Sequence, residues 1–247
     1  IGFSHPLTRF ANFLPEVYSD INGFGYFPKA FFVNISYSFS FAIACSLLGI
    51  IFMNKSIKKM KWKQGFALII PLVSLALIGS YIVSKNDKFS KEEAINWQQQ
   101  YEEKYTIFKT KPQPTIVDVK TTIDLFPEQN SYKVKGTYIL VNKTQAEISE
   151  ILINTNKEIT WNSITSSNLV LVNKDIQFGQ YLFEATQKVV PNDTLTIHFD
   201  FEYQIVPLKG HQSFNAIVDN GTFIRISNYF PSIGYNFDNQ IEDKEER

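Results

Sequence analysis

Two long uncharged stretches dominate the pattern of hydrophobic and polar positions in the first third of the chain. Residues 30–53 read AFFVNISYSFSFAIACSLLGIIFM, and residues 66–83 read FALIIPLVSLALIGSYIV. At about 1.5 Å per residue, a helix of either length would cross a hydrocarbon core of about 30 Å, the second only just. A soluble core helix is the alternative, and the first stretch is too long for it. We therefore predict transmembrane helices over 30–53 and 66–84.

Polar and special residues inside these stretches refine the prediction. Four of them make the first half of the first stretch more polar than lipid contact requires, and such side chains can hydrogen-bond to a neighbouring helix: Asn34, Ser36, Ser38 and Ser40. Pro71 falls early in the second helix, where a proline costs less than at the centre. The lone Cys45 is expected to be a small buried hydrophobic residue and excludes an internal disulfide.

The loop between the two helices, residues 54–65, is strongly basic. It contains five lysines and no acidic residue: Lys55, Lys58, Lys59, Lys61 and Lys63. Clustered lysines in a short loop mark the cytoplasmic side of a membrane protein. The sequence thus predicts a multi-pass membrane protein with this loop on the cytoplasmic side. Residues 1–29, rich in Phe, would form an extracytoplasmic loop, and everything after Ser84 would lie on the same side.

Residues 85–111 show helical periodicity with one aromatic face. Ser90 and Glu93 have capping-box spacing. Five residues then follow at steps of three and four and form a single stripe: Ala94, Trp97, Tyr101, Tyr105 and Phe108. We predict an amphipathic stalk helix whose stripe is a packing face and not a ligand site.

From residue 112 the period changes to two. Residues 193–203 read DTLTIHFDFEY and alternate strictly between apolar and polar side chains, as expected for a half-buried antiparallel strand. Further short strands separated by turn residues fill residues 112–247. The predicted fold class is therefore a membrane α-helical hairpin followed by a mainly-β extracytoplasmic domain, either a sandwich or a twisted antiparallel sheet.

Candidate chemistry is sparse. The three histidines, His5, His198 and His211, do not have the His-Glu-x-x-His spacing, and no phosphate-binding loop motif is present. We therefore expect no catalytic, cofactor-binding or metal-binding residue in this chain. Two alternatives remain open: His198 beside Asp200 as an acid–base pair, and His198 with His211 and a nearby acid as a zinc site. With 24 basic and 24 acidic residues the chain has no net charge, so nucleic acid is not an expected partner.

The segment NGTFIRISNYFPSIGYN, residues 220–236, combines two glycines and a proline with several aromatic residues and has almost no charge. We interpret it as an apolar docking loop for a neighbouring domain, formed by Asn220, Gly221, Phe223, Tyr229, Phe230, Pro231, Gly234 and Tyr235. The rings of Tyr229, Phe230 and Tyr235 are expected to be exposed when that neighbour is absent. An ordinary core loop of the β domain is the alternative, because buried aromatics serve either purpose.

Three stretches carry a resemblance to a known family. The first lies before the first helix and reads LPEVYSDINGFGYFPK. The second runs from Pro114 through YKVKGTYILVN to VPNDTLTIHF. The third is NGTFIRISNYFPSIGYN with its charged continuation. They resemble bacterial membrane proteins in which an ABC-transporter-type permease is fused to a zinc aminopeptidase of the aminopeptidase N family. The chain would be a piece of such a protein, comprising its last membrane helices and the truncated N-terminal β domain of the peptidase.

The resemblance implies a location in the inner (cytoplasmic) membrane and a function for the whole protein. It would be a zinc metallo-aminopeptidase, while this chain supplies the membrane anchor and a non-catalytic β domain, with zinc bound elsewhere. Expected partners are the lipid bilayer, the remaining permease helices, the downstream catalytic domain and an ABC ATPase subunit. The alternative is a membrane-tethered extracytoplasmic β-sandwich that serves as a binding or structural module, with no peptidase downstream.

Overall fold

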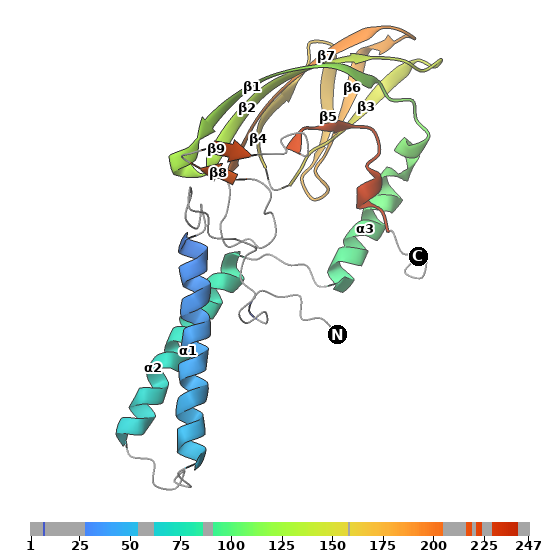
Figure 1. Cartoon of the computed structure of the whole chain (residues 1–247). Coiled ribbons are helices and arrows are strands. Elements are labelled where there is room, and N and C mark those ends of the chain that lie inside the picture. Colours follow the sequence, from blue (N-terminus) through green and yellow to red (C-terminus); the bar gives the residue numbers. More distant parts are fainter. Residues whose placement is uncertain are drawn as a thin grey trace. The chain divides into compact units, whose positions relative to one another are not determined.

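The computed structural model describes residues 7, 28–53, 62–85, 91–157, 159–204, 216–218, 221–223 and 229–241. The chain divides into two compact units (Figure 1). The first contains two long helices and a short hairpin, and the second contains a shorter helix, two β-sheets and the C-terminal segment. A helical hairpin followed by a sandwich-like antiparallel β domain confirms the predicted fold class.

The two long helices, α1 (Pro28–Met53) and α2 (Trp62–Lys85), contact each other. Both are long and apolar enough to cross a membrane. The Ser40 and Ser74 hydroxyl oxygens lie 3.0 Å apart across the pair, which confirms the hydrogen-bonding role expected of the polar first half of α1. Cys45 is exposed on α1, so the expectation that it is buried was wrong.

The described part of the first unit also contains a hairpin of β8 (Ala216–Val218) and β9 (Gly221–Phe223), which pair antiparallel. Gly221 and Phe223 of the expected docking loop therefore lie in a strand. Asn220 lies outside the described residues. The same is true of Lys55, Lys58, Lys59 and Lys61. Lys63 lies in the first turn of α2, where only the backbone is described.

The first sheet of the second unit has the strand order β1-β2-β7-β4. Its long strands are β1 (Thr115–Phe126), β2 (Ser131–Val141) and β7 (Thr194–Gln204), and β4 (Thr160–Thr165) forms one edge. The alternation predicted for β7 is confirmed, because its apolar residues are buried and its polar residues are not: Leu195, Ile197, Phe199, Phe201 and Tyr203 line the core.

The second sheet has the order β10-β3-β6-β5. It comprises β10 (Ser232–Ile233), β3 (Ile148–Asn154), β6 (Gln180–Val189) and β5 (Leu169–Asp175), all antiparallel. β3 is the central element of the unit because Ile151, Leu152, Ile153 and Asn154 are all buried. Neighbours on alternate faces of a strand can all be buried only if both faces of the sheet are covered.

A single glycine makes room for an aromatic ring in the core of the first sheet. Gly136 of β2 lies directly opposite Phe199 of β7. A Cβ atom on Gly136 would lie 2.0 Å from Cζ of Phe199, so the aromatic ring occupies the space that any other residue would fill. Phe199 in turn contacts the ring of Tyr138, with centroids 4.8 Å apart.

Candidate functional site

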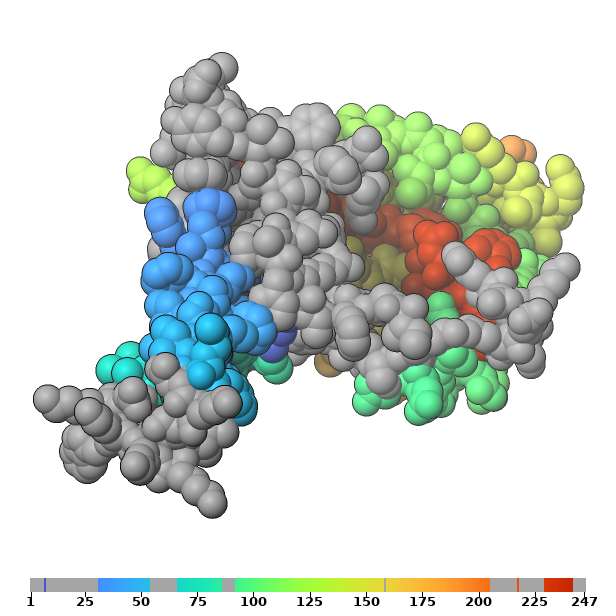
Figure 2. All heavy atoms as spheres, turned by 60° about the horizontal axis from the view of Figure 1, so that its bottom comes forward, coloured from blue at the N-terminus to red at the C-terminus, as the bar shows by residue number. Residues whose placement is uncertain are grey.

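The strongest candidate for a functional element is a layer formed by two segments far apart in sequence. One is α3 (Lys91–Tyr105) with the 3-10 turn η3 (Thr106–Lys109), and the other is the C-terminal segment, residues 229–241. Figure 2 shows the C-terminal segment in red beside the green of α3. Both belong to the second unit. We refer to them together as the α3/C-terminal layer.

The C-terminal segment starts against the inner face of the first sheet. The ring of Tyr229 lies 4.9 Å from that of Tyr203, and the ring of Phe230 lies 5.6 Å from that of Phe199. The hydroxyl of Tyr138 donates a hydrogen bond to the backbone oxygen of buried Pro231, at 2.9 Å. Residues 229–231 therefore contribute to the core of the β domain.

The segment then joins the second sheet. β10 pairs antiparallel with the end of β3, through Ser232 opposite Asn154 and Ile233 opposite Ile153. The Asn154 amide donates to the backbone oxygens of Ser232 and Gly234, and the Gly234 N–H donates to Leu152. Gly234 has φ of +87°, a left-handed conformation that glycine adopts without strain.

These contacts correct one expectation about the docking loop. Tyr229 and Tyr235 are buried and Phe230 is half-buried, so the prediction that their rings form an exposed patch was wrong. The physical reason is that each ring finds a partner within the β domain itself. Whether the segment also contacts a further domain stays a prediction.

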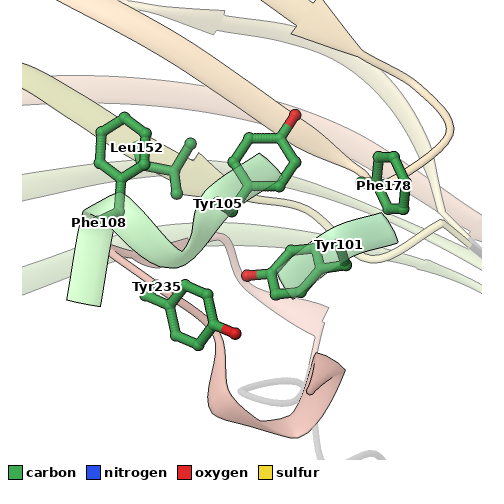
Figure 3. Close-up of a cluster of buried hydrophobic side chains, with 6 residues drawn as sticks. All are labelled: Tyr101, Tyr105, Phe108, Leu152, Phe178 and Tyr235. Atoms are coloured by element: carbon green, nitrogen blue, oxygen red, sulfur yellow. The ribbon is translucent and has the colours of Figure 1, made fainter. Parts of the chain in front are cut away.

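The aromatic stripe predicted for residues 94–108 is confirmed as a packing face. Figure 3 shows Tyr101, Tyr105 and Phe108 meeting three partners from other elements in one buried cluster: Leu152 of β3, Phe178 of the β5–β6 turn and Tyr235 of the C-terminal segment. The rings of Tyr101 and Tyr235 are 5.3 Å apart. Burial raises the pKa of Tyr101 to about 12, so the phenol is neutral at physiological pH. Ser90 of the predicted capping box lies outside the described residues.

Hydrogen bonds also join α3 and η3 to the C-terminal segment. The Asn236 N–H donates to the Tyr101 hydroxyl at 3.0 Å, and the Ile241 N–H donates to a Glu102 carboxylate oxygen at 2.9 Å. Lys109 donates to the Gln240 side chain at 3.2 Å, while its amine lies 4.8 Å from the centre of the Tyr235 ring. The layer is thus fixed by polar contacts as well as by aromatic packing.

Gln113 is a structural residue that sequence reasoning missed. Its amide donates to the backbone oxygen of Glu150 and accepts from the Leu152 N–H, at 2.9 and 3.0 Å. The side chain thereby occupies the hydrogen-bonding groups of β3 just beyond the place where β10 pairs. Its sequence setting between Pro112 and Pro114 suggested only a break, and local patterns carry no signal for such a long-range bond.

A carboxylate at the end of β5 anchors the other end of the layer. Asp175 accepts hydrogen bonds from the Lys104 amine at 2.5 Å and from the Tyr105 hydroxyl at 2.7 Å. Burial alone would raise the pKa of Asp175, but the hydrogen bonds from Lys104 and Tyr105 outweigh it and hold the pKa below its ordinary value. The same contact, with burial as the larger cause, raises the pKa of Tyr105.

A polar cavity of about 390 Å³ opens beside this layer. Its lining includes Trp97, Asn156, Lys157, Asn236, Asp238 and Asn239. The Lys157 amine lies 3.6 Å from the centre of the Trp97 ring. Burial lowers the pKa of Lys157 to about 8, while Asp175 acts in the opposite direction. The Lys157 amine is therefore still mostly protonated at pH 7, but it loses its proton at a lower pH than an ordinary lysine does.

The histidine alternatives find little support in the described residues. His198 lines a second cavity, of about 480 Å³, on the polar face of the first sheet, and its Nδ1 lies 3.0 Å from the Thr137 hydroxyl. Asp200 instead accepts from the Asn162 amide. Within the described part of the chain, no three His, Cys, Asp or Glu side chains gather as metal ligands would. His5 and His211 lie outside the described residues.

Comparisons with known proteins add little. No family model and no curated protein matches the chain. Among solved structures, the yeast delta-COP-I mu-homology domain matches with 19% sequence identity, covering 36% of this chain and 35% of its own. At a TM-score of 0.22, that likeness supports no conclusion about fold or function.

Proposed function

We propose that this chain is the membrane anchor and non-catalytic β domain of a permease-fused zinc aminopeptidase. The membrane part of the proposal is carried by one observation, the exposure of large apolar side chains on α1 and α2. Phe39 is 65% exposed and Ile70 is 70% exposed, and many others on both helices resemble them. In water such a surface would be strongly unfavourable, whereas lipid tails solvate it.

The peptidase part rests on the family resemblance of the three sequence stretches. Catalytic zinc needs three protein ligands, and no three His, Cys, Asp or Glu side chains gather among the described residues. Zinc would thus be bound by a different part of the protein. The role proposed for this chain is to tether that part to the membrane and to support it.

The α3/C-terminal layer suits a supporting role. The segment that leads from α2 into the β domain and the segment that leaves it are held against each other by the Tyr101 and Glu102 hydrogen bonds. We propose that this layer fixes where the chain enters and leaves the β domain. Lipid, permease helices, a catalytic domain and an ABC ATPase subunit are the partners this proposal implies.

A second candidate, a membrane-tethered binding or structural β module, is favoured by the burial of Tyr229 and Tyr235. A β domain that covers its own C-terminal aromatics does not need a neighbour to do so. The cavity lined by Trp97 and Lys157 would then be the first place to look for a ligand.

Two experiments test the proposal: the first tests the membrane anchor that both candidates share, and the second separates the candidates. Resistance of the expressed chain to extraction from membranes by alkaline carbonate tests the anchor, and release into the soluble fraction would contradict it. The coding sequence beyond Arg247 tests the peptidase. A His-Glu-x-x-His motif within the next couple of hundred codons, with aminopeptidase activity lost on substitution of its glutamate, supports the fusion. A stop codon or another β module supports the second candidate.

A further inference from the structure

β1 is a long edge strand. In the described part of the chain it pairs with β2 on one side only, because it stands at the end of its sheet. A bulge interrupts the ladder between Ile116 and Asp118, after which residues 118–126 pair without interruption with residues 131–139 of β2. An uninterrupted edge of this length presents a row of backbone groups to which another strand can add.

The inward-facing side chains of this stretch are only half covered. Val119, Ile123 and Leu125 are 43%, 40% and 44% exposed. Their partners on β2 are Tyr138, Val134 and Tyr132, which are buried. The apolar face of the sheet therefore continues onto β1, where it is only partly covered by the rest of the domain. Edge strands of monomers are usually protected by charge or by short length. β1 is long, and its charged residues, Asp118, Lys120 and Asp124, lie on the opposite face from this apolar row.

The sequence of the stretch is self-complementary about its own midpoint. If two copies pair antiparallel, with Thr122 opposite Thr122, then Lys120 faces Asp124 twice and Val119 faces Leu125 twice. Thr121 and Ile123 also pair, and no like charges meet. The midpoint of this arrangement is the midpoint of the uninterrupted stretch 118–126, so every regular position finds a partner.

We propose that β1 binds β1 of a second copy of this chain, which joins the two four-stranded sheets into one. Opposite charges and apolar pairs placed directly across an antiparallel ladder each stabilise it. A register centred on Val119 would also match Asp118 with Lys120, but it runs into the bulge after a few residues. The other edge strand of the same sheet, β4, has six residues and its own bulge between Trp161 and Ser163.

Cysteine cross-linking tests the register. In the whole chain in membranes, with Cys45→Ser as background, Thr122→Cys should form a disulfide-linked dimer, because residues opposite each other have Cα atoms about 4.5–5.5 Å apart, within disulfide range. Thr165→Cys on the exposed edge of β4 is the matched control and should remain monomeric. Equal cross-linking of both variants, or of neither, would overturn the proposal, as would capture of a different protein by Thr122→Cys.

Charge exchange tests the pairing independently. Lys120→Glu and Asp124→Lys, each added to Thr122→Cys, place two like-charge pairs in the interface and should each reduce cross-linking about tenfold or more. Coexpression of the two variants restores both opposite-charge pairs and should recover the heterodimer. Lys120 is 75% exposed and makes only a long ion pair with the exposed Asp118, at 4.0 Å, so we expect its replacement to leave the fold intact. Cross-linking that does not respond to either charge change would contradict a β1–β1 contact.

Discussion

The hydroxyl of Tyr101 accepts a hydrogen bond from the backbone N–H of Asn236 at 3.0 Å, across 135 residues of sequence. The Tyr101 side chain is fully buried, and its ring lies against that of Tyr235. A single side chain of α3 thus satisfies a backbone group of the C-terminal segment and packs on it. This relationship holds together the two ends of the β domain.

Replacing Tyr101 with Phe should loosen the C-terminal segment. The ring contacts survive, but the Asn236 N–H loses its acceptor, which costs about 1–3 kcal/mol for a buried group. The rate of amide hydrogen exchange should increase more at residues 229–241 than in the long strands. Glu102→Gln keeps an oxygen for the Ile241 N–H and should change exchange much less. Equal exchange rates in Tyr101→Phe and the parent chain would show that this hydrogen bond does not hold the C-terminal segment.

Gly136→Ala should destabilise the first sheet. The new methyl group would lie 2.0 Å from the Phe199 ring, so the ring or the strand must move, and overpacking of this kind costs about 1–3 kcal/mol. Thr137→Ala, on the next residue of the same strand, is the control and should cost less. Adding Phe199→Leu to Gly136→Ala should cost less than the sum of the two single changes, as measured by urea denaturation. Simple additivity would argue against the close approach.

The contact of Asp175 predicts sensitivity to acid. Because the folded-state pKa of Asp175 is depressed, its stabilising contribution is present above the unfolded-state pKa of about 3.9 and is lost as pH falls through the folded-state value. Asp175→Asn should lower stability by about 1.5–3 kcal/mol at pH 7, since two hydrogen bonds to a charged group are weakened. The difference between the two proteins should shrink with acidification. A constant difference from pH 7 down to pH 3 would contradict the assignment.

Lys157 should react with amine reagents at lower pH than other lysines. With a pKa of about 8, about half of its amines are neutral at pH 8, against under about one in a hundred for an ordinary lysine. Competitive acetylation followed by mass spectrometry should give a labelling midpoint near pH 8 for Lys157. Lys143, an exposed lysine on the β2–β3 connection, provides the comparison. Matching profiles for the two lysines would show that the cavity does not perturb Lys157.

Much of the architecture followed from periodicity alone. The uncharged stretches predicted α1 and α2, and the alternation of residues 193–203 predicted β7 with its buried face. The stripe from Trp97 to Phe108 predicted a packing face. These are local patterns, and they reflect which side of an element is covered.

The partners of those faces could not be predicted in the same way. Nothing in the sequence near Tyr229 or Tyr235 indicates that their cover comes from Tyr203 and Tyr101 of the same domain, because such pairing depends on how the sheets stack. The bond of Gln113 to β3 is equally non-local. Buried aromatics look the same in a sequence whether they face a neighbouring domain or their own core.

Membrane topology tests the central claim most directly, because anchoring and the placement of the β domain both depend on it. A reporter that is active only outside the cytoplasm should be active when fused after Lys88 and inactive when inserted near Lys59. Replacing Lys55, Lys58, Lys59, Lys61 and Lys63 with Gln should make the orientation less uniform. The opposite pair of reporter activities would contradict an extracytoplasmic β domain, and activity at neither position would contradict the membrane hairpin itself.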